Sequence, residues 1–476
     1  MKQRIIRSRV SPSEEGSYVL YWMQQAQRLE YNFALDYAAS EAQSRQLPLV
    51  IVFVITASVS EAQPQHYRFM LEGIREIAAS LKARHNRLYV YAGDPVKIIT
   101  ALSQAASVLV MDHGYLKWQR LWRDQIFDNL ESSSIVELDT EAVVPVHVVS
   151  DKEEYSASTL RSKILKLLPE YLDFEPEISG IGSKPCQLAE LDVVPCPDPT
   201  NILELENFGR TVFKAEAGKA RASFEGGYQI ALDKLHEFEN HKLGHYAQYH
   251  NHPDLEIQSD LSPYLHFGQI SPLKIIDAIR KAEDGFGLRA ILADRKNLSG
   301  DMMNLAEFLE ELIVRRELSF NFCSYNPDYD NFAGLPAWAR STLLNHIQDS
   351  RERGYTLEEL ENAASNDVFW NAAQTQMLKT GKMHNYMRMY WGKRVLSWFN
   401  DVEEAYAVLL HLNNKYELDG RGPNAFAGVA WCFGKHDRPW VERPIYGMVR
   451  FMNANGLKRK FDMQAYLRKV FTGELE

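Results

Sequence analysis

The sequence has few of the signals that mark secreted, membrane-spanning or disulfide-stabilised proteins. It holds four cysteines in 476 residues, none in a CxxC pair, so we expect reduced thiols. No apolar run reaches the roughly 18 residues that a membrane-spanning helix needs. The basic N-terminal segment lacks the apolar stretch of a secretory signal. We therefore expect a cytoplasmic protein without membrane contact, associated with the nucleoid if the source is prokaryotic.

A standard dinucleotide-binding fingerprint is also missing. The first strand pattern is not followed by GxGxxG, and the Gly180–Gly182 pair has Pro185 where a third glycine would stand. This absence argues against a nicotinamide-dependent oxidoreductase. Four histidines between positions 241 and 252 lack an HExxH pattern and a carboxylate at fixed spacing. We therefore predict no metal site and expect these histidines to face solvent.

Positive charge is scarce overall but concentrated near the C-terminus. The formal net charge is −10, yet residues 421–460 carry eight basic residues against two acidic ones. Because phosphate contact needs a local basic face rather than a basic total, this region is a candidate DNA-binding surface. A solvated charged face is the alternative. The basic residues are Arg421, Lys435, Arg438, Arg443, Arg450, Lys458, Arg459 and Lys460.

Length and periodicity indicate two or three domains. Residues 1–150 contain near-continuous apolar strand patterns that alternate with helical ones, which predicts an α/β domain with a doubly wound parallel sheet. Residues 151–205 include a stretch rich in Gly, Pro and Ser, typical of an interdomain linker. Residues 206–476 predict an all-helical domain. The expected strands are 17–23, 47–56, 87–93, 106–112 and 134–140, and the expected helices include 24–45, 65–84, 95–104, 224–240, 272–282, 302–323 and 402–412.

Three segments of the helical half could carry chemistry. In SDLSPYLHFGQISP (259–272), Ser262-Pro263 and Ser271-Pro272 predict two helix starts, whose free N–H groups favour an anion such as a cofactor pyrophosphate. Trp391 and Trp398, seven residues apart on one helical pattern, are expected on one face about 10 Å apart, with Trp370 on another segment. Tryptophans so spaced either pack a core or pass single electrons. The polar and aromatic run 411–440 suits nucleobase stacking and phosphate contact.

Taken together, these motifs closely resemble those of class II cyclobutane pyrimidine dimer photolyases. The resemblance rests on SDLSPYLHFGQIS, GKMHNYMRMYW, NKYELDGRGPN and AWCFGKHDRPW in this order. It extends through EELIVRREL (310–318) and YWMQQAQRLEYNFAL (21–35) and covers nearly the whole chain. It implies an α/β antenna-type domain (1–150), a linker (151–205) and an all-helical FAD-binding catalytic domain (206–476).

The resemblance also implies FAD as the cofactor. Asn413 would face flavin N5, while Arg388 and Asp419 would form an ion pair beside the ring system. Trp391, Trp398 and Trp370 would form the chain that photoreduces the flavin. The residues on the phosphate side would be Tyr246, Ser259, Asp260, Leu261 and Ser262.

The implied reaction is light-dependent repair of damaged DNA without net redox change. Excited reduced FAD would donate an electron to a flipped-out pyrimidine dimer, the ring would split, and the electron would return. Glu311 would hydrogen-bond the dimer and steady its radical anion, and Trp431 would pack against it. The residues that fill the hole in the duplex or hold its backbone would be Arg438, Trp440 and Arg450.

The resemblance leaves the antenna chromophore open. QQAQR (24–28) lacks an acidic residue often found there, and Phe33 stands where tryptophan is frequent. A deazaflavin is preferred, a folate is the alternative, and no antenna at all is the third possibility. The runner-up function is a cryptochrome-like photoreceptor, which the lack of a long C-terminal tail and the presence of Glu311 disfavour. A (6-4) photolyase is disfavoured, because the two active-site histidines that its chemistry requires are not identifiable in this sequence. We expect a monomer.

Overall fold

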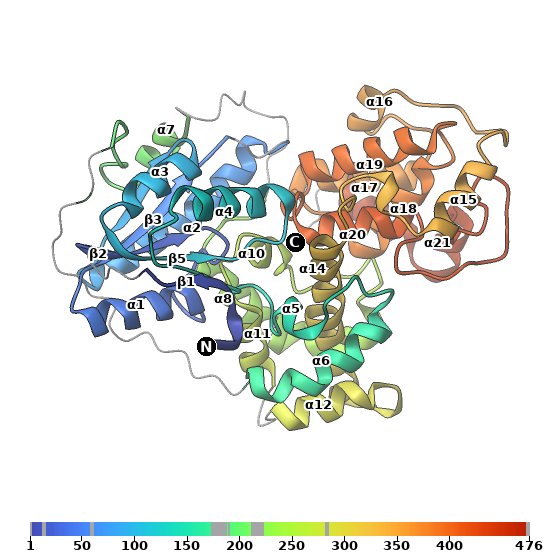
Figure 1. The fold of residues 1–476 in the computed structure, drawn as a ribbon. Helices are drawn as coiled ribbons and strands as arrows, with labels where there is room; N and C mark the ends of the chain where they lie inside the picture. The colour runs from blue at the N-terminus through green and yellow to red at the C-terminus, as the bar shows by residue number, and fades with distance from the viewer. Residues whose placement is uncertain are drawn as a thin grey trace.

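The computed structural model describes residues 2–11, 16–57, 61–172, 188, 191–210, 223–280 and 285–472. A six-stranded sheet with flanking helices forms one side of the molecule, and a larger helical region forms the other (Figure 1). The expected fold class, an α/β region followed by a helical one, is confirmed. Gly180, Gly182, Pro185 and Cys186 lie outside the described residues.

The sheet has the strand order β1-β6-β5-β2-β3-β4. All five strands that the sequence predicts are present and run parallel, because continuous apolar segments can be buried on both faces. A sixth strand, β1, which the sequence did not predict, pairs antiparallel with β6 and makes the sheet mixed at this edge. The sequence of β1, IIRSR, lacks the apolar pattern of the other strands. Its Arg7 is accommodated by an ion pair with Glu137 of β6, a partner that is distant in the sequence. The strands are β1 Ile5–Arg9, β2 Tyr18–Met23, β3 Leu49–Ile55, β4 Leu88–Ala92, β5 Ala106–Asp112 and β6 Ile135–Leu138.

Helices cover both faces of the sheet. Alternate strand residues, such as Tyr21 and Trp22, enter two separate cores, as the period-two alternation of a strand requires. One core includes α1 (Phe33–Arg45) and α2 (Pro64–Ala83), and the other includes α3 (Pro95–Ser103) and α4 (Lys117–Asn129). From β2 the strands are added first toward β3 and β4 and then, on the other side of β2, toward β5 and β6. This change places a topological switch point at the carboxyl ends of β2 and β5.

The helix expected over residues 24–45 begins only at Phe33. Residues 24–32 instead form a loop at the carboxyl end of β2. The carboxylate of Asp112 accepts the backbone N–H groups of Gln24, Gln25 and Ala26 at 2.9–3.0 Å, and Asn32 caps α1. Phe33 packs under the guanidinium of Arg4 at 3.9 Å. These hydrogen bonds therefore place Gln24 and Gln25 at the switch point.

The helical region begins within the stretch expected to be a linker. α6 (Ala157–Leu172) lies within residues 151–205 but packs against α12 (Gly285–Ala293). The domain boundaries at residues 150 and 205 stay a prediction. The long pattern 302–323 is interrupted by a π-helical segment, Glu310–Arg315. The remaining α-helices are α5 Val146–Val149, α7 Ile202–Arg210, α8 Tyr228–Glu237, α9 Tyr246–Tyr249, α10 Ser262–His266, α11 Pro272–Ile279, α13 Gly300–Leu309, α14 Arg316–Tyr325, α15 Ala337–Asn345, α16 Leu357–Glu361, α17 Val368–Thr380, α18 Asn385–Val395, α19 Val402–Tyr416, α20 Pro423–Cys432, α21 Ala454–Lys460 and α22 Met463–Thr472.

Buried charged groups join the sheet to the helical region. The guanidinium of Arg28, in the loop after β2, donates to the carbonyls of Tyr31, Thr140 and Gly268. From α14, Glu317 accepts the backbone N–H of Val143 at 2.5 Å. Because unpaired buried polar groups are costly, these bonds fix the register between the two regions. Within the described residues, no helix has the length and apolarity needed to cross a membrane.

We expect Arg28→Ala to destabilise the protein by about 3 kcal/mol, because three buried carbonyls would lose their donor. Thermal unfolding followed by circular dichroism measures the effect. Arg84→Ala removes an exposed arginine whose hydrogen bond is local and serves as the matched control. Equal melting temperatures for the two variants would contradict this account.

Candidate active site

A cavity of about 350 Å³ opens in the helical region. It brings together segments far apart in the sequence, including α9, α10, the π-helical segment, α18 and α20. Nine of the residues singled out from the sequence line it, drawn from all of these segments. They are Tyr246, Ser259, Asp260, Leu261, Ser262, Glu311, Arg388, Asp419 and Trp431.

The segment that enters α10 forms one wall of this cavity. Ser262 was expected to cap α10, but the N-cap is Leu261 and carries no side-chain cap bond. The hydroxyl of Ser262 instead hydrogen-bonds Asp419 and contributes to lowering its pKa. The second expected cap is confirmed, because Ser271 accepts the backbone N–H of Leu273 at 3.2 Å.

Asp260 brings lysines to the same wall. It forms ion pairs with Lys382 and, at 4.0 Å, with Lys242. Although burial opposes ionisation, Lys382 lowers the pKa of Asp260. Lys382 also lines the cavity and was not identified from the sequence, since a lysine gains this meaning only beside its partner. This wall offers the cationic contact that a phosphate group needs.

The π-helical segment presents Glu311 to the cavity. Its neighbour Glu310 is held away in a bidentate ion pair with Arg161 of α6, at 2.5 and 2.8 Å. A π-turn changes the direction of successive side chains and is frequent at functional sites. Burial raises the pKa of Glu311 above its usual range. Glu311 can therefore serve as a hydrogen-bonding group that holds its proton more readily than an exposed glutamate.

Arg388 on α18 is shared by two buried carboxylates. Its Nη2 lies 3.2 Å from Glu417 and 3.4 Å from Asp419. The expected Arg388–Asp419 pair is therefore present, while Glu417 was missed. Burial, together with the charge of Asp419, raises the pKa of Glu417 to about 8, whereas Arg388 helps to hold the pKa of buried Asp419 below its usual range. One guanidinium thus balances one carboxylate at neutral pH.

Asn413 stands one turn before Glu417, and its carbonyl accepts the backbone N–H of Glu417 at 3.0 Å. It is 1% exposed and does not line the cavity itself. Its Nδ2 and the Nε of Arg388 have no hydrogen-bond partner among the described residues. An unsatisfied buried donor is costly, and Arg388, which carries one of these two, lines the cavity. This fits a cavity that receives a polar group.

The three tryptophans form a continuous ladder. Trp391 and Trp370 are stacked with ring centroids 6.0 Å apart, and Trp370 and Trp398 are 5.2 Å apart, edge to face. The expectation that Trp391 and Trp398 share a helix face was wrong, because α18 ends at Val395. Trp370, from α17, lies between them. Arg388 stands three residues before Trp391, so one helix links the cavity to the ladder.

A second group of aromatic and basic residues continues from Trp431 to the surface. The guanidinium of Arg450 lies 5.8 Å from the Trp431 ring and 5.1 Å from that of Trp440. Arg438 also lies over Trp440, at 5.5 Å, and Trp440 is 40% exposed. The basic face is smaller than expected, because Arg421 and Lys435 are buried. The three expected DNA-contacting residues nevertheless lie together.

The sequence predicted that the histidines between 241 and 252 face solvent, but His250 does not. His250 lines the cavity and stacks on Tyr246 with centroids 4.7 Å apart. Among the described residues there is no group of three metal-ligating side chains. Cys196, Cys323 and Cys432 are free thiols.

A second cavity, of about 130 Å³, lies at the switch point of the sheet. The loop after β2 supplies Gln24, Gln25 and Gln27, and α4 supplies Trp118 and Trp122. The sheet region supplies further lining residues around β3 and α2, and the helical region contributes His266, Phe267, Arg421, Gly422 and Pro423. Phe33 is not among the lining residues.

Comparison with known proteins agrees with this geometry. The chain is 42% identical over 459 residues to a deoxyribodipyrimidine photo-lyase of Methanothermobacter thermautotrophicus, covering 96% of each chain. The DNA photolyase family model matches residues 19–179. The chain belongs to the DNA photolyase family.

Solved structures share the fold of this photolyase-family chain at low identity. A Synechocystis cryptochrome superposes with a TM-score of 0.72 at 15% identity, covering 96% of this chain and 88% of that one. An archaeal photolyase from Sulfolobus tokodaii, described with two FAD molecules, has a TM-score of 0.66 at 17% identity, covering 95% and 89%. The family implies FAD, and the orphaned Nε of Arg388 and the cationic wall of the large cavity fit it.

We expect Glu417→Gln to retain flavin and Asp419→Asn to bind it about tenfold more weakly. Glutamine imitates the protonated Glu417, whereas asparagine leaves Arg388 without its charged partner. The ratio of flavin to protein absorbance after gel filtration measures the difference. Equal flavin content in the two variants would contradict the assignment of the proton to Glu417 and of the negative charge to Asp419.

Proposed function

We propose that this protein splits pyrimidine dimers in DNA, using light and a bound FAD. One observation carries the proposal: a single cavity joins the Arg388–Asp419 pair to Glu311 and Trp431, and Trp431 continues to an exposed basic surface. The membership in the DNA photolyase family supports it, as do relatives named deoxyribodipyrimidine photo-lyase. The class II assignment remains part of the proposal and rests on the sequence motifs.

FAD, when bound, supplies the electron that opens the cyclobutane ring. Lys382 and the segment 259–262 would hold its phosphates. Arg388, balanced by Asp419, and Asn413 would lie against its ring system. The protein's task there is to keep a fixed polar environment from which water is excluded.

Glu311 and Trp431 would receive the dimer after it leaves the duplex. Flipping costs a few kcal/mol, and less for a poorly stacked lesion, which favours damaged sites. Glu311 would hydrogen-bond a carbonyl or imide group of the dimer, and its raised pKa keeps a proton available for that bond. The Trp431 ring, which lines the cavity, would cover one face of the lesion.

Arg438, Trp440 and Arg450 would contact the distorted duplex. Arg450 bridges the rings of Trp431 and Trp440, so the lesion side and the surface are coupled. The side chain of an exposed tryptophan can fill the space that an extruded nucleotide leaves, and nearby arginines neutralise phosphates.

The ladder Trp391–Trp370–Trp398 would bring electrons to the flavin from the protein. Its contact distances of 5.2 and 6.0 Å between ring centroids support hopping between rings. We propose that the cavity at the switch point receives an antenna chromophore, since ligands bind in such crevices. Its tryptophans and glutamines suit a planar heteroaromatic ring, a deazaflavin in preference to a folate. Cytoplasmic location and a monomeric state stay predictions.

We expect Glu311→Gln to lower the dimer repair yield about tenfold, because the proton-sharing bond to the dimer would be lost. Repair is measured on thymine-dimer DNA under near-UV light with fully reduced flavin. Glu307→Gln, one turn earlier and paired with Arg295, is the control. A wild-type repair yield for Glu311→Gln would show that Glu311 takes no part in the reaction. Persistence of dimers with the native enzyme would refute the repair function.

We expect Trp391→Phe to abolish photoreduction of the oxidised flavin, because phenylalanine is much harder to oxidise. Chemically reduced enzyme should still repair dimers. Absorbance of the oxidised flavin under blue light measures the first effect, and the repair assay the second. Trp338→Phe, in α15 outside the ladder, is the control. Unchanged photoreduction in Trp391→Phe would show that electrons follow another route.

A further inference from the structure

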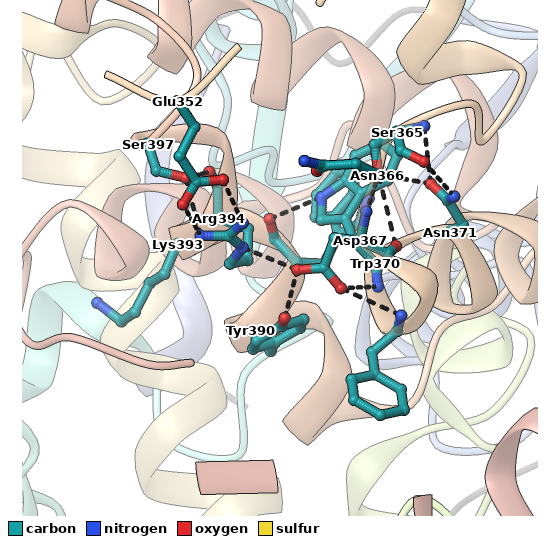
Figure 2. A network of polar contacts seen from close by, with 12 residues as sticks. Glu352, Ser365, Asn366, Asp367, Trp370, Asn371, Tyr390, Lys393, Arg394 and Ser397 are labelled. Atoms are coloured by element: carbon teal, nitrogen blue, oxygen red, sulfur yellow. Dashed lines mark hydrogen bonds and ion pairs between the residues drawn. The ribbon is translucent and has the colours of Figure 1, made fainter. Parts of the chain in front are cut away.

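A polar network surrounds the outer part of the tryptophan ladder (Figure 2). Asp367 stands at its centre, as the N-cap of α17. Its carboxylate accepts the backbone N–H groups of Phe369 and Trp370, both at 3.1 Å. It also accepts Tyr390 Oη at 2.5 Å and Arg394 Nε at 2.8 Å, both from α18. One carboxylate therefore ties the helix of Trp370 to the helix of Trp391.

The network also fixes the tryptophans directly. Trp370 Nε1 donates to the carbonyl of Trp391 at 3.0 Å. The guanidinium of Arg394 lies 5.3 Å from the Trp398 ring and is held by Glu352 in two hydrogen bonds, at 2.9 and 3.1 Å. The network thus contacts Trp370 through its backbone N–H and Trp398 through its ring, and it reaches Trp391 through Trp370.

The charges of this network do not cancel. The guanidinium of Arg394 is paired with two carboxylates, Asp367 and Glu352, so the formal charges of the three groups sum to −1. The side chain of Asp367 is only 8% exposed, whereas that of Glu352 is 45% exposed. Water therefore screens Glu352 far more than Asp367. The uncompensated negative charge acts mainly from Asp367, at the helix end that carries Trp370.

We propose that Asp367 is a positioning residue for the electron path, which holds Trp370 against Trp391 and stabilises positive charge on the ladder by its own fixed negative charge. The proposal rests on the ladder's proposed role in flavin photoreduction. Light would first drive one electron from Trp391 to the oxidised flavin. One electron then passes from Trp370 to Trp391, which leaves the cationic hole on Trp370. No proton needs to move in these steps.

The negative charge would favour this second step and slow the return of the electron. A cation near a buried carboxylate is stabilised strongly, since the local dielectric is low. A plain capping role would not have this consequence. Asp401 illustrates the difference, because it caps α19 through two backbone N–H groups, at 2.8 and 3.2 Å, on the exposed surface.

The test compares Asp367→Asn with Asp401→Asn in flavin-loaded protein. Asparagine is as good an N-cap as aspartate, so both variants keep their caps and lose one charge. In Asp367→Asn, the oxygen that accepts from Tyr390 and Arg394 is also replaced by an amide nitrogen. Transient absorption after a blue laser flash measures the yield and lifetime of the tryptophan radical cation, and it detects only molecules that hold flavin. We expect the lifetime in Asp367→Asn to fall about tenfold and that in Asp401→Asn to stay at the wild-type value.

Glu352→Gln provides a second, independent variant if Asp367→Asn folds poorly. It removes a charge of the same sign at a more exposed position, so its lifetime should fall in the same direction but less. Wild-type lifetimes in both Asp367→Asn and Glu352→Gln would overturn the proposal, as would an equal loss in Asp401→Asn. Failure of the ladder itself is distinguishable, because Trp391→Phe would then give a normal radical signal.

Discussion

A single guanidinium shared by two buried carboxylates organises the centre of this molecule. Arg388 contacts both Glu417 and Asp419, and its one charge can neutralise only one of them, so the second keeps its proton. Buried charges are tolerated only when they are paired in this way. The arrangement fixes the turn after α19 against α18, and so sets the inner wall of the large cavity.

The same turn reaches the second cavity. Two residues after Asp419, the buried guanidinium of Arg421 donates to the carbonyls of Asn414 and Leu418. Arg421 also lines the cavity at the sheet. Gly420 and Gly422 allow the tight packing, because a Cβ would lie 2.7 Å from the carbonyl oxygen of Asn413 and 2.6 Å from Nδ1 of His266, respectively. The proposed flavin and antenna sites therefore depend on one short segment.

From Arg388, helix α18 continues to Trp391 and then to Arg394. It thereby connects the cavity, the ladder and the charged network within three turns. The surface proposed to contact DNA is joined to the cavity through Trp431 and Arg450. The proposed electron supply and the proposed lesion binding would thus both use the flavin cavity.

The amino-acid sequence by itself determined the elements and the inventory of the site. Apolar runs placed five strands within about two residues, and the spaced motifs identified nine lining residues of the cavity. It could not place what depends on distant partners. The antiparallel strand β1 was hidden by its charges, Lys382 and Glu417 acquired their roles beside Asp260 and Arg388, and Trp370 entered the ladder between Trp391 and Trp398 only when α17 packed on α18. Local periodicity is written along the chain, whereas burial, shared charge and ring contact are set by residues that only the tertiary structure brings together.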